Sequence, residues 1–377
     1  MTPTDISTIQ PKAWAILSRS FGADRMAGTY LFHGPEGRGR WSLAVALAAL
    51  LNCSGPIRSR EDEHLAFPCG QCRSCRNVFS LNFEGLLFAV PLPPHKNPGE
   101  AIDLTNEYIE AKRREPFRIV SSPTGANIPI ATAREIKRRL SRKAPEEITR
   151  VVLFYRMEKM LAASADALLK LIEEPPEDTV VVLTAERPDS LLPTIQSRSQ
   201  KIRMERIPGR TIKRYLTERY DLRENRAQLL ARVSDGSLGK ALEMTGGDED
   251  EDSSRRAVGL LLFRSLLLDD GPQVIAHLTE LINAKDRSGA ENLLRLWQSL
   301  IRDCARYAVV GDDSELTNLD FAPEVKRLSP QFAGINLASR MIEEIKITLA
   351  DLRLNVHILG ALTALTLKLK SNIESDL

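Results

Sequence analysis

Long apolar runs and aromatic residues are scarce in this sequence. Phe, Trp and Tyr together make up 5% of the 377 residues. The longest apolar run, at 43–51, is only about half the length that a helix needs to span a bilayer. The segment 1–10 is polar and lacks the basic and apolar regions of a secretory signal. These absences argue against a membrane or secreted protein, and we expect a cytoplasmic location.

An excess of charge of either sign is also absent. The 52 Lys and Arg residues are balanced by 50 Asp and Glu residues, which leaves a formal net charge of +2. Any contact with nucleic acid must therefore come from a local basic patch and not from the field of the whole chain. The hydrophobic content of 43% is enough to build real cores, and the length suggests two or three domains.

The first half of the chain alternates between strand and helix patterns. Buried strands are predicted at 29–33, 151–154 and 180–184, and helices at 40–51, 131–142 and 162–172. Such alternation is typical of a parallel sheet with helices on both faces, so we predict an α/β module over residues 1–206. Residues 84–128 are rich in Pro, Gly and charge, and we expect them to form an elaborated loop.

Strand patterns stop after residue 208. Two or three short helices are predicted at 207–246, which would form a small helical lid. An acidic linker without regular structure is expected at 247–255. From 256 to 377 the apolar spacing is helical throughout, which predicts an all-α domain.

A glycine-rich loop lies between the first predicted strand and the first predicted helix. Gly34 and Gly39 have the spacing of a phosphate-binding P-loop, and Gly37 lies between them. In that motif a Lys follows the last Gly to reach the phosphates, and a Ser or Thr comes next to hold Mg²⁺. Here Arg40 and Trp41 stand in those positions. An ordinary strand-to-helix turn is the alternative explanation for these glycines taken alone.

The acidic residues of an ATP-hydrolysing site are missing as well. They are expected directly after the strand at 151–154, where they would hold Mg²⁺ and orient water. Tyr155 and Arg156 stand there instead. Arg40 keeps a positive charge but is longer than Lys and planar, so it does not replace Lys at a point-charge site. The sequence therefore predicts a nucleotide-binding architecture without intrinsic ATP hydrolysis, and whether ATP still binds stays open.

Four of the five cysteines are grouped at a spacing that suits a metal ion. Cys69, Cys72 and Cys75 recur at every third position, and Cys53 lies sixteen residues upstream of them. In a reducing compartment such a group favours metal binding over disulfides. Four thiolates suit a closed, tetrahedral Zn²⁺ site of the structural kind, so we predict zinc as the cofactor.

Two alternatives to this ligand set deserve comparison. An iron–sulfur cluster of the ferredoxin type requires a further Cys followed by Pro just downstream, but Phe79 and Ser80 stand there. His64 is a substitute ligand if Cys53 lies too far away. The fifth cysteine, Cys304, is in an apolar helical stretch and is expected to be an inert core residue.

Two stretches near the end of the predicted α/β module have distinctive sequences. Residues 166–176 read Asp-Ala-Leu-Leu-Lys-Leu-Ile-Glu-Glu-Pro-Pro, and residues 191–199 read Leu-Leu-Pro-Thr-Ile-Gln-Ser-Arg-Ser. Both closely resemble the clamp-loader branch of the AAA+ ATPases. In that family the corresponding stretches read ALLKxLEEPP and LLPTIxSRC, with a strand between them. The resemblance covers about residues 10–245 and is most specific over 150–205. A cysteine cluster inserted after the P-loop helix is a further feature of the bacterial members.

The resemblance implies roles for individual residues. Arg198 matches the arginine of the Ser-Arg-Cys motif, which in this family projects into the ATP site of the neighbouring subunit, and Ser199 replaces the Cys. Thr184 matches the polar sensor at the end of a sheet strand. Gly239 stands where active members carry a nucleotide-sensing arginine.

The resemblance also suggests a function for the basic helix predicted at 131–142. Its cationic residues, which could face DNA in a clamp loader, are Lys137, Arg138, Arg139, Arg142 and Lys143. A solvated helix face is the alternative for such a charge run.

The resemblance implies a function in DNA replication. Because the P-loop is degenerate, the chain is most similar to a non-hydrolysing subunit of the DNA polymerase III clamp loader. Its partners would be the gamma/tau and delta subunits and, through the complex, the sliding clamp and primer–template DNA. Residues 256–377 would form the helical collar through which the subunits oligomerise. An ATP-hydrolysing subunit of the gamma/tau type and a zinc-dependent binding module outside replication are the alternatives.

Overall fold

The chain folds into two compact units, Met1–Thr245 and Gly246–Leu377. The structure is a computed structural model that describes residues 3–120, 125–143, 145, 147–160, 168–246, 249–268, 274, 286–334, 336–354 and 356–375. Most of the predicted helix at 162–172 lies outside the described residues, and its last part is α8 (Leu169–Glu173). Among the described helices, none is long and apolar enough to cross a membrane.

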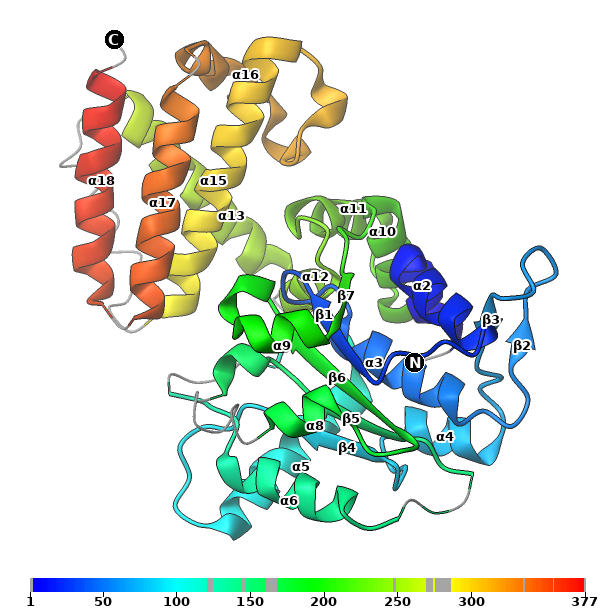
Figure 1. The fold of residues 1–377 in the computed structure, drawn as a ribbon. Helices are drawn as coiled ribbons and strands as arrows, with labels where there is room; N and C mark the ends of the chain where they lie inside the picture. The colour runs from blue at the N-terminus through cyan, green and yellow to red at the C-terminus, as the bar shows by residue number, and fades with distance from the viewer. Residues whose placement is uncertain are drawn as a thin grey trace. The chain divides into compact units, whose positions relative to one another are not determined.

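The first unit is built around a five-stranded sheet in which all neighbouring strands are parallel (Figure 1). In spatial order the strands are β4 (Leu86–Ala89), β5 (Arg150–Phe154), β6 (Thr179–Ala185), β1 (Thr29–His33) and β7 (Gln200–Arg203). The predicted parallel sheet is confirmed, and the three predicted strands correspond to β1, β5 and β6. The edge strands β4 and β7 were not predicted, because each has only four residues.

Helices cover both faces of this sheet, as predicted (Figure 1). The apolar core on one face joins β1 and β5 to α3 (Arg40–Leu51) and α1 (Pro3–Ile9). On the other face, α6 (Ile130–Leu140), α8 and α9 (Pro193–Arg198) pack on the alternate residues of the same strands. Successive strand residues point to opposite faces, so a strand covered on both sides must be apolar throughout.

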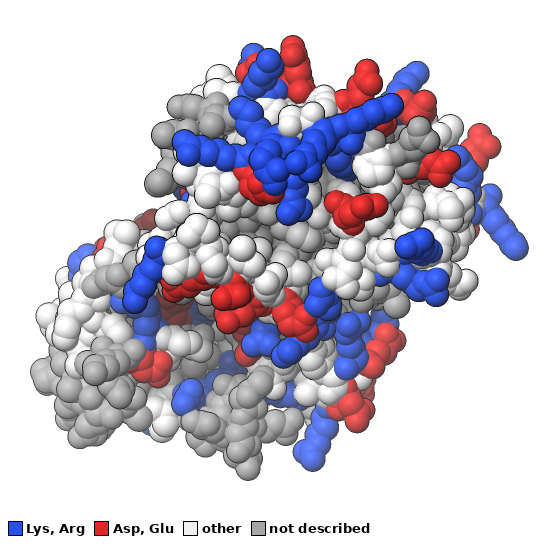
Figure 2. Space-filling model, turned by 90° about the horizontal axis from the view of Figure 1, so that it is seen from below, with Lys and Arg blue, Asp and Glu red and all other residues white. Residues whose placement is uncertain are grey.

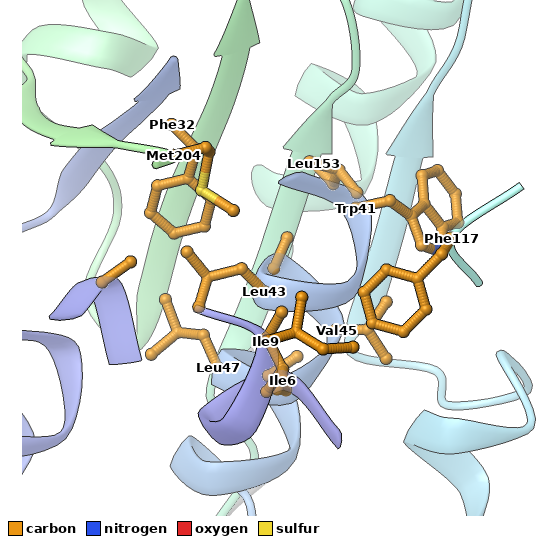
Figure 3. Packing of buried hydrophobic residues seen from close by; sticks show 14 of the residues in the cluster. Ile6, Ile9, Phe32, Trp41, Leu43, Val45, Leu47, Phe117, Leu153 and Met204 are labelled. Atoms are coloured by element: carbon orange, nitrogen blue, oxygen red, sulfur yellow. The ribbon is translucent and has the colours of Figure 1, made fainter. Parts of the chain in front are cut away.

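The helix after the glycine loop is buried almost completely. Eleven of its twelve residues are buried, from Arg40 to Leu50. Figure 3 shows Leu43 and Leu47 of α3 with Ile6 and Ile9 of α1 in the same apolar cluster. Because α3 has no solvated face, its first turn and the loop before it are fixed by packing.

The segment at 84–128 is a correction to the sequence analysis. It was expected to be an elaborated loop, but it contains β4 and a seventeen-residue helix, α5 (Pro98–Arg114). Residues that favour a helix start stand at the beginning of α5, but the overall content of Pro and Gly suggested a loop. The Asn97 side chain accepts a hydrogen bond from the Glu100 N–H at 3.0 Å, and Pro98 occupies the first turn, where its missing N–H costs nothing.

Three short helices follow the sheet, in agreement with the prediction for 207–246. They are α10 (Gly209–Tyr220), α11 (Glu224–Val233) and α12 (Leu238–Glu243). All three lie within the first unit, and apolar residues of each belong to the core cluster that contains α3. We call these three helices the lid.

The second unit is helical, as predicted. Its long helices are α13 (Glu249–Leu268), α15 (Arg287–Val310), α17 (Leu337–Arg353) and α18 (Ile358–Glu374), with the short α16 (Ala322–Leu328) between α15 and α17. The acidic stretch at 247–255 was expected to lack structure, but α13 includes it from Glu249 onward. Acidic residues are favourable at the N-terminus of a helix because of the helix dipole. Residues 247 and 248 lie outside the described residues.

Candidate functional site

The glycine loop has the conformation that its glycines permit. Gly34, Gly37 and Gly39 have φ values of 138°, 77° and 93°, a region that other residues adopt only with strain. Gly39 caps α3 in the left-handed conformation. The predicted order of strand, glycine loop and helix is therefore present, with β1 before the loop and α3 after it.

The lid lies directly on this loop. The backbone N–H of Gly239 donates to the carbonyl of Gly37 at 2.9 Å, and the Ser237 hydroxyl donates to the carbonyl of Glu36 at 2.8 Å. A Cβ atom at Gly37 would come within 2.9 Å of the Gly239 Cα. From the other side, the Gln10 side chain donates to the Arg38 carbonyl at 3.0 Å. The segment at the start of α12 in the lid thus packs directly against the backbone of the glycine loop.

A second contact holds the lid on the sheet module. Glu115, which follows α5, is buried, and its carboxylate accepts hydrogen bonds from the hydroxyls of Tyr215 and Tyr220 on α10. The Tyr215 ring also meets Phe117 edge-on, with ring centres 5.6 Å apart. No local pattern in the sequence predicts these contacts, because the partners are about 100 residues apart.

The two residues in the Lys and hydroxyl positions of the P-loop are packed into the interior. Trp41 is 1% exposed and stacks on Phe88 of β4 at 5.0 Å with an angle of 10° between the rings. The Arg40 guanidinium lies 5.8 Å from the centre of the Tyr155 ring. Tyr155, in the position of the first missing acid, meets Trp41 edge-on at 5.5 Å. Arg40, Trp41 and Tyr155, which we expect to replace catalytic groups, thus lie together, and we call them the aromatic cluster.

Lys112 of α5 completes the aromatic cluster, and sequence reasoning missed it. Its side chain is buried, and Nζ lies 5.1 Å from the centre of the Tyr155 ring and 5.6 Å from that of Trp41. Nζ also donates to the Arg118 carbonyl at 2.6 Å. Burial lowers the pKa of Lys112 to about 7, although the two ring faces favour the charged form.

Arg156 and Thr184 meet at the ends of β5 and β6. The Thr184 hydroxyl, which is fully buried, accepts the backbone N–H of Arg156 at 2.8 Å. The Arg156 guanidinium forms ion pairs with Glu36 at 3.4 Å and with Glu158 at 3.6 Å. The residue in the position of the second missing acid therefore binds the glycine loop itself, through Glu36.

Gly239, where the resemblance leads us to expect a sensing arginine in active members, has no room for a side chain, which leads to a prediction. A Cβ atom there would lie 2.6 Å from the Gly37 Cα and 2.7 Å from the Phe117 carbonyl oxygen. Restoring the family residue with Gly239→Arg should therefore lower the free energy of unfolding by about 1–3 kcal/mol or more, as overpacking does. Urea unfolding of the purified chain measures this.

The matched control for this prediction is Gly209→Arg, because a Cβ at Gly209 meets nothing within 4 Å. We expect that control to unfold like the parent chain. A Gly239→Arg variant that kept full stability and gained ATP binding would contradict the steric explanation.

The four grouped cysteines come together in space. One sulfur from each of Cys53, Cys69, Cys72 and Cys75 lies within 4.8 Å of the others, and His64 does not belong to this group. Cys53 follows α3, whereas Cys72 caps α4 (Arg73–Phe79). A tetrahedral ion with bonds of about 2.3 Å to sulfur requires sulfur atoms about 3.8 Å apart. The distance of 4.0 Å between the Cys69 and Cys75 sulfurs is close to that value.

Backbone N–H groups point at the sulfur atoms. The N–H groups of Cys69, Cys72 and Cys75 lie 3.2, 3.3 and 3.4 Å from the sulfurs of Cys53, Cys69 and Cys72. Burial by itself would raise the pKa of Cys72, but hydrogen bonds from the Cys75 and Ser54 backbone lower it to about 6. Such bonds favour the thiolate of Cys72, the form that binds a metal, whereas burial raises the pKa of Cys53 and of Cys75. The cluster can therefore hold a metal ion such as zinc.

Arg198 lies at the end of α9, and its side chain is 44% exposed. The adjacent Ser199 hydroxyl is buried and donates to the Ile195 carbonyl at 2.8 Å, which fixes the end of the helix. The Arg198 Nε lies 3.1 Å from Oε1 of Glu173, the last residue of α8. Within the described part of the chain, Glu173 is the ion-pair partner of Arg198.

The basic residues of the predicted helix at 131–142 lie on α6 and just after it. Arg138 and Arg139 form ion pairs with Glu135 at 2.7 and 3.0 Å, and their hydrogen bonds lower the pKa of Glu135 to about 2. Arg142 and Lys143 are exposed. Figure 2, which views the molecule from below, shows Lys and Arg side chains crowded on the face that includes α6.

The fold and these sites define the chain as an AAA+-type α/β module with a helical lid, followed by a helical unit. Comparison with known proteins agrees. The family described as DNA polymerase III, delta subunit, matches residues 9–208, more than half of the chain. The chain therefore belongs to the DNA polymerase III delta-prime family of clamp-loader subunits, and the resemblance inferred from the sequence is confirmed.

Three relatives illustrate the similarity. The DNA polymerase III subunit delta' of Bacillus subtilis is 27% identical over 256 residues, which are 68% of this chain and 65% of the relative. Subunit delta' of Pseudomonas aeruginosa is 31% identical over 195 residues, 51% of this chain and 48% of the relative. Subunit gamma/tau of Mycobacterium tuberculosis is 28% identical over 279 residues, 71% of this chain and 42% of the relative. The matches therefore span less than two thirds of each relative.

Proposed function

We propose that this chain is a non-hydrolysing subunit of the DNA polymerase III clamp loader, which completes the ring of subunits and supplies an arginine to ATP bound by its neighbour. The aromatic cluster is the observation that carries the first part. Arg40, Trp41 and Tyr155 stand where the phosphate Lys, the Mg²⁺ hydroxyl and the first acid would be, and they are buried against one another. Trp41 and Tyr155, whose rings pack in the core, cannot take the place of Mg²⁺ ligands without opening it, and Arg40 lacks the compact charge of the phosphate Lys.

The rival function is that of an ATP-hydrolysing gamma/tau-type subunit, since gamma/tau proteins are among the relatives. The test is ATP turnover by the isolated chain, where we expect none above background. Tyr155→Asp should not restore activity, because catalytic groups act as a unit and the Lys, the hydroxyl and the second acid would still be missing. The matched control is Tyr155→Asn, which removes the ring as Asp does but adds no carboxylate. Turnover that co-purifies with the chain and follows its concentration would contradict this prediction.

Ring completion is the second part of the proposal. The helical unit from 256 to 377 would serve as the collar that joins the subunits, and gamma/tau and delta would be the partners. Mixing the purified chain with those subunits should give one complex by analytical sizing. That complex should load the sliding clamp on primed DNA, and loading should fall when the chain is omitted. A zinc-dependent module outside replication would remain separate from the other subunits.

Two further features fit this function. The cysteine cluster is proposed to hold one structural Zn²⁺. This ion would join the C-terminal end of α3, which is the end away from the glycine loop, to α4. The basic face of α6 is proposed to approach primer–template DNA inside the complex, although the pairing of Arg138 and Arg139 with Glu135 reduces its charge. The proposed site of action is the cytoplasm, where the chromosome of a bacterium is replicated.

A further inference from the structure

The contact between Glu173 and Arg198 joins the two stretches that carried the family resemblance. Glu173 ends α8, Arg198 ends α9, and Nε of the arginine lies 3.1 Å from Oε1 of the glutamate. The side chains are 36% and 44% exposed, so the pair is accessible from solvent. An Arg side chain has five N–H donors in a rigid fork, and an acid close to Nε leaves donors for a second oxyanion.

Both residues of this pair are attached to rigid backbone. On the Glu173 side, Ile172 is 1% exposed, and its carbonyl accepts the Thr29 hydroxyl at 2.8 Å. On the Arg198 side, Ile195 is 1% exposed, and its carbonyl accepts the buried Ser199 hydroxyl. Ile172 and Ile195 belong to the same apolar cluster. The position of the guanidinium therefore depends mainly on the torsion angles of the Arg198 side chain.

We infer that Glu173 is a positioning residue for Arg198: it orients the guanidinium so that the arginine is already directed outward when a neighbouring subunit binds. This inference rests on the proposed function of Arg198 as an arginine acting on a neighbour's ATP. A free Arg side chain populates many rotamers, and a group that must reach a transition state acts faster when it is held near the productive geometry. Glu173 does not touch the ATP in this arrangement; it acts through Arg198.

The exposure of the Glu173–Arg198 ion pair limits how far its loss should change kcat. Ion pairs at exposed positions are weak, because water screens the charges and the side chains lose freedom. We therefore expect Glu173→Ala to lower kcat for ATP hydrolysis by the reconstituted complex about two- to five-fold, the size that couplings between exposed charges reach. KM for ATP and the size of the complex should not change, because neither depends on the orientation of Arg198. Glu173→Gln, which keeps an acceptor oxygen but not the charge, should restore part of the lost rate.

The neighbouring Glu174 provides a matched control. Glu174 has the same side chain and is also exposed, and it forms no ion pair with any of the described residues. Glu174→Ala should leave kcat unchanged. The decisive comparison is a double-mutant cycle, since Glu173→Ala should have no further effect once Arg198 has been replaced by Ala.

The outcomes separate this inference from the proposed function. If Arg198→Ala lowers kcat but Glu173→Ala does not, the positioning role is wrong and the role of Arg198 stands. If Glu173→Ala lowers kcat equally with and without Arg198, Glu173 acts by some other route and the inference is overturned. If Arg198→Ala itself leaves kcat unchanged, the proposed function of the arginine fails, and the inference fails with it.

Discussion

Replacement of Arg198 by Ala in the reconstituted complex should strongly reduce ATP hydrolysis and clamp loading while the complex stays assembled. In the transition state of phosphoryl transfer, negative charge on the γ-phosphoryl oxygens must be stabilised, and a guanidinium supplied by a partner does this with several planar donors. Arginines that act in this way contribute on the order of 10³ to 10⁵ in rate in the GTPases studied. A ring with several ATP sites would lose less in total, because only one site depends on this chain.

Three measurements on one preparation test this prediction: sizing of the complex, ATP hydrolysis stimulated by DNA and clamp, and the rate of clamp loading. Arg198→Lys should restore little, since an ammonium keeps the charge but loses the fork. Arg187, an exposed arginine just after β6, provides the control Arg187→Ala, which should behave like the parent chain. Clamp loading at the parent rate by Arg198→Ala would rule out the proposed role. Dissociation of the ring would mean that Arg198 is a structural residue.

Local patterns in the sequence predicted those parts of the fold that depend on neighbouring residues. The strand at 29–33 and the helix at 40–51 have the predicted bounds, because a short apolar run, a glycine loop and a long apolar helix follow one another without interruption. The buried strands predicted at 151–154 and 180–184 are also present, with slightly longer bounds: β5 begins at Arg150, and β6 extends from Thr179 to Ala185. Strands covered by helices on both sides give a strong signal.

The predictions for two segments were wrong for a different reason. They relied on composition, whereas the position of a residue relative to a helix decides whether it favours the helix. At 84–128 the Pro and Gly residues suggested a loop, yet Pro98 stands in the first turn of α5, where proline is favourable. At 247–255 the acidic residues suggested a linker without regular structure, yet α13 begins at Glu249, and acidic residues are favourable at the start of a helix because of its dipole. Proline and acidic residues therefore favour a helix when they lie at its N-terminus, although in general composition they suggest a loop or linker.

The candidate site could be predicted only as a set of missing groups. The sequence indicates that Arg40, Trp41 and Tyr155 replace the usual residues, but it gives no sign that they pack on Phe88 and Lys112 from an intervening strand and helix. The docking of the lid on the glycine loop is equally hidden. The Ser237 hydroxyl and the Glu36 carbonyl that it contacts are 201 residues apart. Such contacts depend on the tertiary fold, and no local pattern encodes them.

Loss of one cysteine of the cluster is the second change with a large expected effect. Cys72→Ser should release the metal and markedly lower the free energy of unfolding, because a structural Zn²⁺ contributes directly to folding. Apparent binding free energies reach about 10–16 kcal/mol in zinc-finger peptides. Here the loss should be smaller than that, since the core that contains α3 folds around apolar residues as well. Elemental analysis of the parent chain should find one Zn²⁺ per chain, and thermal unfolding should occur at a lower temperature in the variant.

The position of Cys72 is what makes this substitution decisive. Its sulfur accepts the Cys75 N–H at 3.4 Å at the start of α4, so a serine hydroxyl could still cap the helix. A loss of stability in Cys72→Ser would therefore report on the metal and not on the cap. Cys304→Ala is the control, because Cys304 is buried in the second unit, and its removal should lower stability without changing the zinc content. Iron in the purified protein, or full stability of Cys72→Ser without bound metal, would exclude a structural zinc site.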